Sequence, residues 1–278
     1  MATLAELEKR LRGVETAGQL ASALKTVSAA KLSQANALFS SFSAYSGVCL
    51  ELTQTYAEEF GEVFPCKNEK APRCIAVFGT DRGLSGSFNS ELFPLLDKAA
   101  DEEGDKIFLV SGKTAAEHLT GRGVEIKQLY ALPDVPSFAD TEAVRTDIAR
   151  MYAEGEISCA ELLYMRQINS ITWKPTLEKI LPFSAGNVAE EETLFLPDKK
   201  TVLGDCASLA LGALIYAAAL ETAVSAQSAT LIAMRSACDN AEETSARLGK
   251  AIHSKRQAQI TESVIETSSD KYRDEEEQ

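Results

Sequence analysis

The sequence predicts an α/β fold with long helices, in which an antiparallel coiled coil of the N- and C-terminal helices carries an inserted α/β domain. Two terminal stretches, residues 3–59 and 203–270, contain no proline, and small or apolar residues recur in them at heptad spacing. From Arg73 to about Asp198, apolar runs instead alternate with helical patterns, which is typical of a mostly parallel sheet. The α/β segment therefore lies between two helices in the chain.

The first helix begins with a capping signal, because Thr3 is followed three residues later by Glu6. The apolar seam of this helix is interrupted at Lys25 and Ser28. Leu24 and Val27, one residue before each, predict that the register of the seam shifts there. The seam positions are Leu4, Leu7, Leu11, Val14, Gly18 and Ala21, then Leu32, Ala35, Phe39, Phe42 and Cys49.

The middle of the chain predicts four strands, three helices and an edge segment. After Met165, Asn169 and Ser170 mark a turn into a further, antiparallel segment, which Pro175 confines to a sheet edge or a strand end. The expected strands are Cys74–Phe78, Ile107–Val110, Val124–Leu132 and Ala160–Met165, and the expected helices are Phe88–Glu102, Thr114–Leu119 and Phe138–Ala153.

The second long helix must find a partner for its seam. Helices of about 55 and 65 residues reach on the order of 80 to 100 Å, well beyond a compact domain, and one exposed apolar seam is not stable alone. We therefore expect the terminal helices to pair. The expected parts are residues 1–60 and 203–270 as helices, 73–200 as the α/β domain and 271–278 as an acidic, frayed tail. The second seam is Ala210, Ala213, Ala217, Leu220, Val224, Gln227, Leu231, Met234, Cys238, Ala241, Ser245, Leu248 and Ile252.

Composition excludes several classes of function. A net charge of −13 over 278 residues repels phosphate backbones, so nucleic acid is not an expected partner. Six scattered cysteines without CxxC spacing, and no signal peptide, indicate free thiols. The two histidines are far apart, so no zinc cluster is expected. No apolar run reaches 18 residues, so no membrane span is predicted.

The stretch FGTDRGLSGSFNSE, residues 78–91, follows an apolar run and precedes a helical pattern, as a phosphate-binding loop would. Its glycines do not have the GxGxxG spacing of a dinucleotide site. The alternative is a tight turn that needs glycine backbone freedom, in which Asp81 or Ser87 caps nearby amides.

A second glycine motif, SGKT at residues 111–114, resembles the end of a Walker A loop. Ile107 stands where that loop needs another glycine. No carboxylate pair or activated nucleophile stands out either. The residues thus indicate a mechanical or scaffolding protein.

Four motifs carry a family resemblance over nearly the whole length: VSAAKL at 27–32, TDRGLSGSFN at 80–89, MRSACDNAEE at 234–243 and RQAQIT at 256–261. Through them the chain resembles the gamma subunit of F-type ATP synthases, the central stalk of a rotary motor. It departs from the family pattern at residues 17–22, where basic residues are usual, at Ser263, and at Asp270 and Lys271. The resemblance therefore identifies a divergent member.

The resemblance implies a non-catalytic rotor shaft that couples proton or sodium flow through a membrane c ring to ATP synthesis or hydrolysis. The coiled coil turns inside a ring of alpha and beta subunits. A Rossmann-like body binds the epsilon subunit and the c ring and holds no nucleotide, cofactor or metal. The chain would be peripheral to the cytoplasmic face of the cell membrane, without a transit peptide, and not a homo-oligomer.

The resemblance also assigns residues to three places. The shaft contacts with the catalytic ring are Leu24, Val27, Lys31, Arg256, Gln257, Ile260 and Thr261. The turn of the α/β domain is Asp81, Arg82, Gly83, Gly86 and Asn89. A foot near the c ring is Phe195, Leu196, Pro197 and Asp198.

Two other functions remain open from the residues alone. One is a nucleotide-binding α/β enzyme, an oxidoreductase or kinase-like protein, with helical arms. The other is a coiled-coil adaptor or tether that forms homodimers through its seams.

Overall fold

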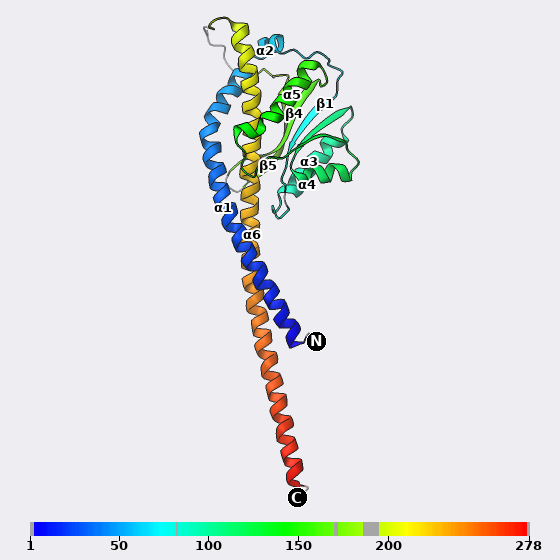
Figure 1. The fold of residues 1–278 in the computed structure, drawn as a ribbon, viewed down its shortest axis with the longest axis vertical. Helices are drawn as coiled ribbons and strands as arrows, with labels where there is room; N and C mark the ends of the chain where they lie inside the picture. The colour runs from blue at the N-terminus through cyan, green and yellow to red at the C-terminus, as the bar shows by residue number, and fades with distance from the viewer. Residues whose placement is uncertain (1–2, 82, 170–171, 186–194, 277–278) are drawn as a thin grey trace. The chain divides into compact units, whose positions relative to one another are not determined.

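The computed structural model describes residues 3–81, 83–169, 172–185 and 195–276 (Figure 1). They fall into two compact units. The larger unit, Ser28–Leu231, contains the α/β domain, and the smaller unit joins residues up to Val27 with those from Ile232 onward. Two long helices, α1 (Leu4–Thr55) and α6 (Lys199–Glu276), contribute to both units.

The larger unit is built on one five-stranded sheet with the strand order β3-β2-β1-β4-β5. The first four strands are parallel, and β5 pairs antiparallel with β4 at the sheet edge. All four expected strands are confirmed, and so is the antiparallel edge segment containing Pro175. The bounds are β1 Arg73–Phe78, β2 Lys106–Ser111, β3 Ile126–Tyr130, β4 Cys159–Gln167 and β5 Trp173–Leu181.

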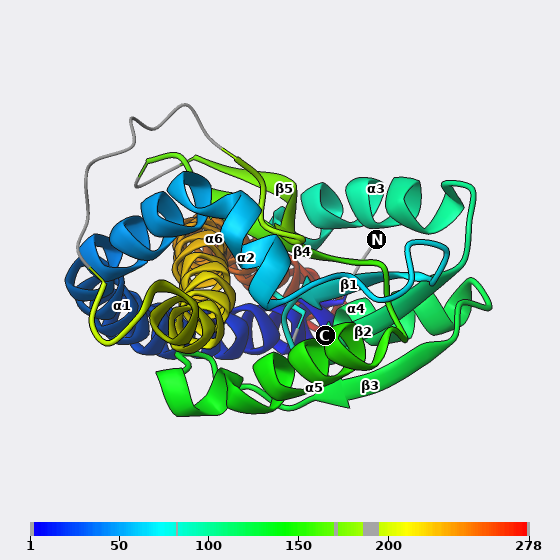
Figure 2. The same cartoon turned by 90° about the horizontal axis from the view of Figure 1, so that it is seen from above.

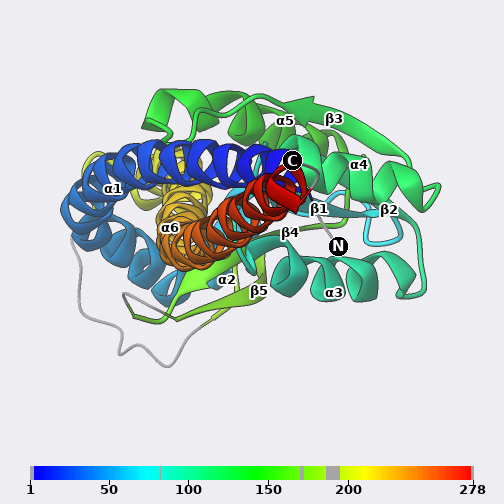
Figure 3. The ribbon, with the colours of Figure 1, turned by 90° about the horizontal axis from the view of Figure 1, so that it is seen from below.

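Helices cover both faces of this sheet because successive side chains of its buried strands point to opposite sides. In β1, Cys74 and Ala76 pack toward α5 and α6, whereas Ile75 and Val77 pack toward α3 and α4. Figures 2 and 3 show α3 and α5 on opposite faces. The bounds are α3 Phe88–Asp101, α4 Lys113–Gly121 and α5 Glu142–Glu154, which a 3-10 helix, η1 Phe138–Thr141, precedes.

In the larger unit, α1 and α6 pair antiparallel, as expected. Ala35 packs with Val224, Phe42 stacks edge-on against the Tyr216 ring at 4.7 Å, and Cys49 packs with Ala210. These α1 positions are seven residues apart, as a coiled-coil seam requires. After Thr55 comes a short helix, α2 (Ala57–Val63), whose Phe60 is fully buried.

The smaller unit repeats the antiparallel pairing. Ala21 packs with Met234 and Cys238, and Gly18 lies against Ala241. The predicted capping box at the start of α1 is confirmed: the Thr3 N–H donates to Glu6 at 2.8 Å, and the Glu6 N–H donates to the Thr3 hydroxyl at 3.3 Å.

The predicted register shift in α1 is wrong at Val27, although Leu24 does pack against the cluster of Ala21, Met234 and Cys238. Ser28 is 5% exposed, whereas Val27 is 49% exposed. Ser28 is seven residues from both Ala21 and Ala35, so the seam keeps its register and accepts a small polar side chain there.

Helix α6 has two features that the sequence reasoning did not anticipate. It includes residues 271–276 of the segment expected to be an acidic tail. Within the described residues it is also the one helix long and apolar enough to cross a membrane by composition, although no such segment was predicted. In the structure, 56% of that apolar window is buried inside the chain, as in a core helix.

Candidate functional site

The loop after β1 closes around the N-terminus of α4. The Asp81 carboxylate accepts a hydrogen bond from the Lys113 N–H at 3.0 Å. The Thr80 carbonyl accepts the Thr114 N–H at 3.1 Å and the Thr114 hydroxyl at 2.5 Å. Asp81 therefore caps an amide as expected, but it caps α4, whereas Ser87 makes no side-chain cap on α3.

The need for glycine lies at Gly86 and Gly112. Gly112 has φ +102°, and a Cβ there would lie 2.5 Å from the Gly79 carbonyl carbon. Gly86 has φ +56°, in the left-handed region. Gly83 has neither a left-handed φ nor any atom within 4 Å of a built Cβ, so the expected role of that glycine is wrong. Arg82 lies outside the described residues.

Asn89, the remaining turn residue, stabilises the loop through two hydrogen bonds. The Asn89 side chain accepts a hydrogen bond from the Thr80 hydroxyl at 3.2 Å and donates one to the Ser85 hydroxyl at 3.4 Å. The first two amides of α4 are already bonded to Asp81 and Thr80. A phosphate cradle needs such amides free. This geometry therefore supports a structural turn rather than a nucleotide site.

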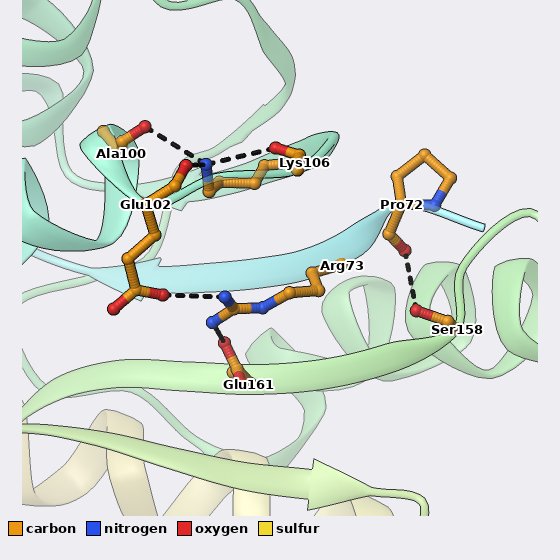
Figure 4. Close-up of polar contacts among 8 residues, drawn as sticks. Pro72, Arg73, Ala100, Glu102, Lys106, Ser158 and Glu161 are labelled. Atoms are coloured by element: carbon orange, nitrogen blue, oxygen red, sulfur yellow. Dashed lines mark hydrogen bonds and ion pairs between the residues drawn. The ribbon is translucent and has the colours of Figure 1, made fainter. Parts of the chain in front are cut away.

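An ion cluster at the opposite end of the sheet is also structural (Figure 4). Arg73, at the start of β1, pairs with Glu102 at 2.7 Å and Glu161 at 2.6 Å. The Arg73 guanidinium lowers the pKa of Glu102. Lys106 donates to carbonyl groups at the end of α3, including that of Ala100 at 3.3 Å. These charges pair with one another and fix the end of α3 to the sheet.

The shaft candidates on α6 lie on the surface of the smaller unit. Arg256 pairs with Glu8 of α1 at 2.9 Å, and its side chain is still 55% exposed. Ile260 is 59% exposed, and Gln257 and Thr261 are exposed as well. All four residues can therefore contact another chain.

The shaft candidates on α1 have different surroundings. Leu24 is half-buried and packs against the cluster of Ala21, Met234 and Cys238. Val27 is about half exposed. The structure does not bring Leu24 together with Arg256, because the residue that meets Arg256 is Glu8.

Lys31 belongs to the larger unit. Its ammonium group forms an ion pair with Asp134, in the segment after β3, and each side chain is about one-third exposed. The antiparallel register that sets Gly18 against Ala241 places Glu8 opposite Ala251, so the sequence alone does not indicate the pair of Glu8 with Arg256. Asp134 lies outside any periodic segment, and no sequence signal places it beside Lys31.

The four foot residues precede α6. Phe195 packs edge-on against Tyr56, with ring centroids 5.4 Å apart. Asp198 accepts hydrogen bonds from the Thr201 N–H at 2.9 Å and the Thr201 hydroxyl at 2.8 Å, which lower its pKa. Asp198 is thus the N-terminal cap of α6. Leu196, at 75% exposed, and Pro197 remain available for contact.

Comparison with known proteins extends these observations. The ATP synthase family model matches residues 3–269. The chain is 28% identical to the ATP synthase gamma chain of Staphylococcus carnosus, over 96% of this chain and 97% of that one. It is 27% identical to the gamma chain of Ruminococcus albus, over 97% and 98%.

Solved structures share the fold. A chain in the structure of the Euglena gracilis mitochondrial ATP synthase rotor matches with a TM-score of 0.63 and 16% identity, over 92% of this chain and 98% of that one. A chain of the Tetrahymena thermophila central stalk and c-ring structure matches with a TM-score of 0.61 and 17% identity, over 78% and 99%. Since the family model and the relatives span nearly the whole sequence, the chain belongs to the ATP synthase family, as a divergent gamma chain.

Proposed function

We propose that this chain is the non-catalytic central stalk of an F-type ATP synthase, which couples ion flow through a membrane c ring to ATP synthesis or hydrolysis in a ring of alpha and beta subunits. Membership of the gamma chain family supports this role. The solved structures it resembles are described as a rotor and as a central stalk with c ring.

The observation that carries the proposal is the helix pair of the smaller unit. It buries a seam of small side chains around Ala21 and Cys238, and it leaves Arg256, Gln257 and Ile260 exposed. A rotor needs surface contacts that differ between orientations, because only differential contacts can bias the states of surrounding sites. We assign Val27, Arg256, Gln257, Ile260 and Thr261 to these contacts.

The other partners follow from the same assignment. The α/β body would bind the epsilon subunit and rest on the c ring, with Leu196 and Pro197 as exposed foot residues. The complex would be peripheral to the cytoplasmic face of the cell membrane. Leu24 and Lys31 would support the shaft indirectly, since Leu24 packs between the helices and Lys31 pairs with Asp134.

Both alternative functions conflict with specific contacts. A homodimeric tether needs free seams, but Ala35 and Cys49 of α1 are buried against α6 of the same chain. A nucleotide-binding enzyme needs free amides after a strand, but those of Lys113 and Thr114 are bonded to Asp81 and Thr80.

Reconstitution tests the proposal. We expect the chain to co-purify with alpha and beta subunits, and the ATPase activity of the assembly to require it. Equal activity without the chain would refute the rotor role. Saturable binding of ATP or NAD to the isolated chain would favour the enzyme, and a stable homodimer would favour the tether.

A further inference from the structure

Helix α6 contacts the end of strand β4 along the edge that β1 leaves unpaired. β1 pairs with β4 only as far as Leu163, whereas β4 runs on to Gln167. On the other side, Met165 lies opposite Pro175 of β5. Because proline has no N–H, this is a non-hydrogen-bonded pair, and the polar backbone groups of Met165 and Gln167 face away from β5.

Two side chains of α6 supply the missing partners. The Ser225 hydroxyl donates to the Met165 carbonyl at 3.2 Å, and the Glu221 carboxylate accepts the Gln167 N–H at 3.0 Å. Glu221 and Ser225 are four residues apart, so they lie on the same face of the helix. Ser225 is 1% exposed. We call these two hydrogen bonds the α6–β4 clamp.

The clamp lies beside a charged network on the sheet. Arg166 of β4 pairs with Glu178 of β5 at 2.5 Å, and its Nε donates to the Tyr164 hydroxyl at 3.0 Å. Burial raises the pKa of Glu221. The hydrogen bond from the Gln167 N–H and the nearby Arg166 charge oppose that rise, and Glu178 adds to it. A buried carboxylate such as that of Glu221 lowers the stability of the fold unless a hydrogen bond compensates for its burial.

The rest of the contact between α6 and the sheet is apolar, and it includes the large side chains of Leu211 and Ile215. Ala218 and Ala219 pack on one face of the sheet, and Ala226 and Ala229 join the cluster on the other. Apolar contacts resist separation of the two surfaces but do not depend on direction. A hydrogen bond, in contrast, is lost when rotation changes the angle between donor and acceptor. The clamp is thus suited to resist rotation of the helix against the sheet.

We propose that Glu221 and Ser225 are positioning residues that lock α6 to the α/β sheet, so that torque passes from the body into the helix. This inference rests on the proposed rotor function. Helix α6 continues without a break to Glu276, so the lock connects the sheet to a helix that also forms the smaller unit.

The test uses the reconstituted membrane complex carrying Glu221→Ala with Ser225→Ala. We expect the number of ions pumped per ATP hydrolysed to fall, because α6 can then turn against the sheet without passing on the full torque. Glu221→Gln, which keeps an acceptor for the Gln167 N–H, should preserve the ratio. Asp205→Ala removes an exposed carboxylate from the same helix and is the matched control.

Hydrogen exchange at Gln167 provides a second readout, and it should quicken in the double variant. An unchanged pumping ratio with faster exchange would overturn the inference and leave the rotor role intact. Hydrolysis that does not depend on the chain at all would overturn both. If the double variant does not assemble, Ser225→Ala alone decides: a lowered ratio supports the lock, and a normal ratio refutes it.

Discussion

Gly18 of α1 lies directly against Ala241 of α6, such that a Cβ added to Gly18 would be 3.0 Å from the Ala241 Cβ. Real Cβ atoms rarely come so close. The absence of a side chain at Gly18 therefore sets how closely the helices of the smaller unit approach. Helix axes in such pairs lie about 8–10 Å apart, depending on the side chains between them.

The first prediction concerns this close approach. Gly18→Leu places a branched side chain between the helices and should lower the free energy of unfolding by about 1–3 kcal/mol. Gly13→Leu is the matched control, because a Cβ at Gly13 meets no atom within 4 Å. Replacing that helical glycine should stabilise the chain by up to about 1 kcal/mol. Thermal unfolding measures both, and equal melting temperatures would contradict the helix packing.

The second prediction separates the glycines in the loops that follow β1 and β2. Gly112→Ala should destabilise the α/β unit strongly, because φ is +102° and the new Cβ would lie 2.5 Å from the Gly79 carbonyl carbon. Strain of this kind costs on the order of 1–3 kcal/mol or more. Gly83→Ala should change stability by less than about 0.5 kcal/mol. Denaturant unfolding compares the two, and a larger loss at Gly83 would contradict the turn geometry.

The third prediction concerns the exposed face of α6. Arg256→Ala with Gln257→Ala should lower coupled ATP turnover of the reconstituted complex and leave the α/β unit folded, because both side chains are exposed. Turnover assays and circular dichroism check the two halves of this statement.

Glu8→Ala is the control for that variant. It breaks the same ion pair with Arg256, which as an exposed pair contributes about 1 kcal/mol or less, but it keeps the arginine. Turnover with Glu8→Ala should stay near normal. An equal loss in both variants would show that Arg256 acts through Glu8 rather than through another subunit.

The fourth prediction is a pH dependence. Burial raises the pKa of Glu221 above its ordinary value of 4.5. The folded state then holds this proton more tightly than the unfolded state, so this group's contribution to stability falls as pH rises from about 4.5 through the folded-state pKa. Glu221→Gln removes that loss and should raise the melting temperature at pH 8. The gain should shrink near pH 4, and an equal gain at both pH values would contradict the assignment.

Periodicity in the sequence predicted most of the fold. The strands, the edge position that Pro175 requires and the antiparallel pairing of α1 with α6 all follow from apolar spacing and from turn residues. The predicted register was wrong at Ser28, because a small polar residue in a seam position interrupts the apolar pattern of the sequence. A seven-residue count from Ala21 to Ala35 would have found it.

The sites were harder to predict than the fold. Asp81 was recognised as a capping residue, but the helix it caps is reached only through the close contact of two loops, which sequence spacing does not encode. Gly83 and Gly86 were expected together because the motif contains both, whereas the backbone angle and the crowding that require glycine at Gly86 and Gly112 are three-dimensional. The pairing of Glu221 with Gln167 likewise depends on β1 ending before β4 does.

The most direct test is the distance between labels at Leu20 and Asn240 in the assembled complex, since both residues are exposed and lie on facing stretches of the two helices. Spin labels at these positions should report one short separation, consistent with helix axes about 8–10 Å apart. A separation several times larger, or a broad range of distances, would contradict the antiparallel pairing on which the rotor function depends.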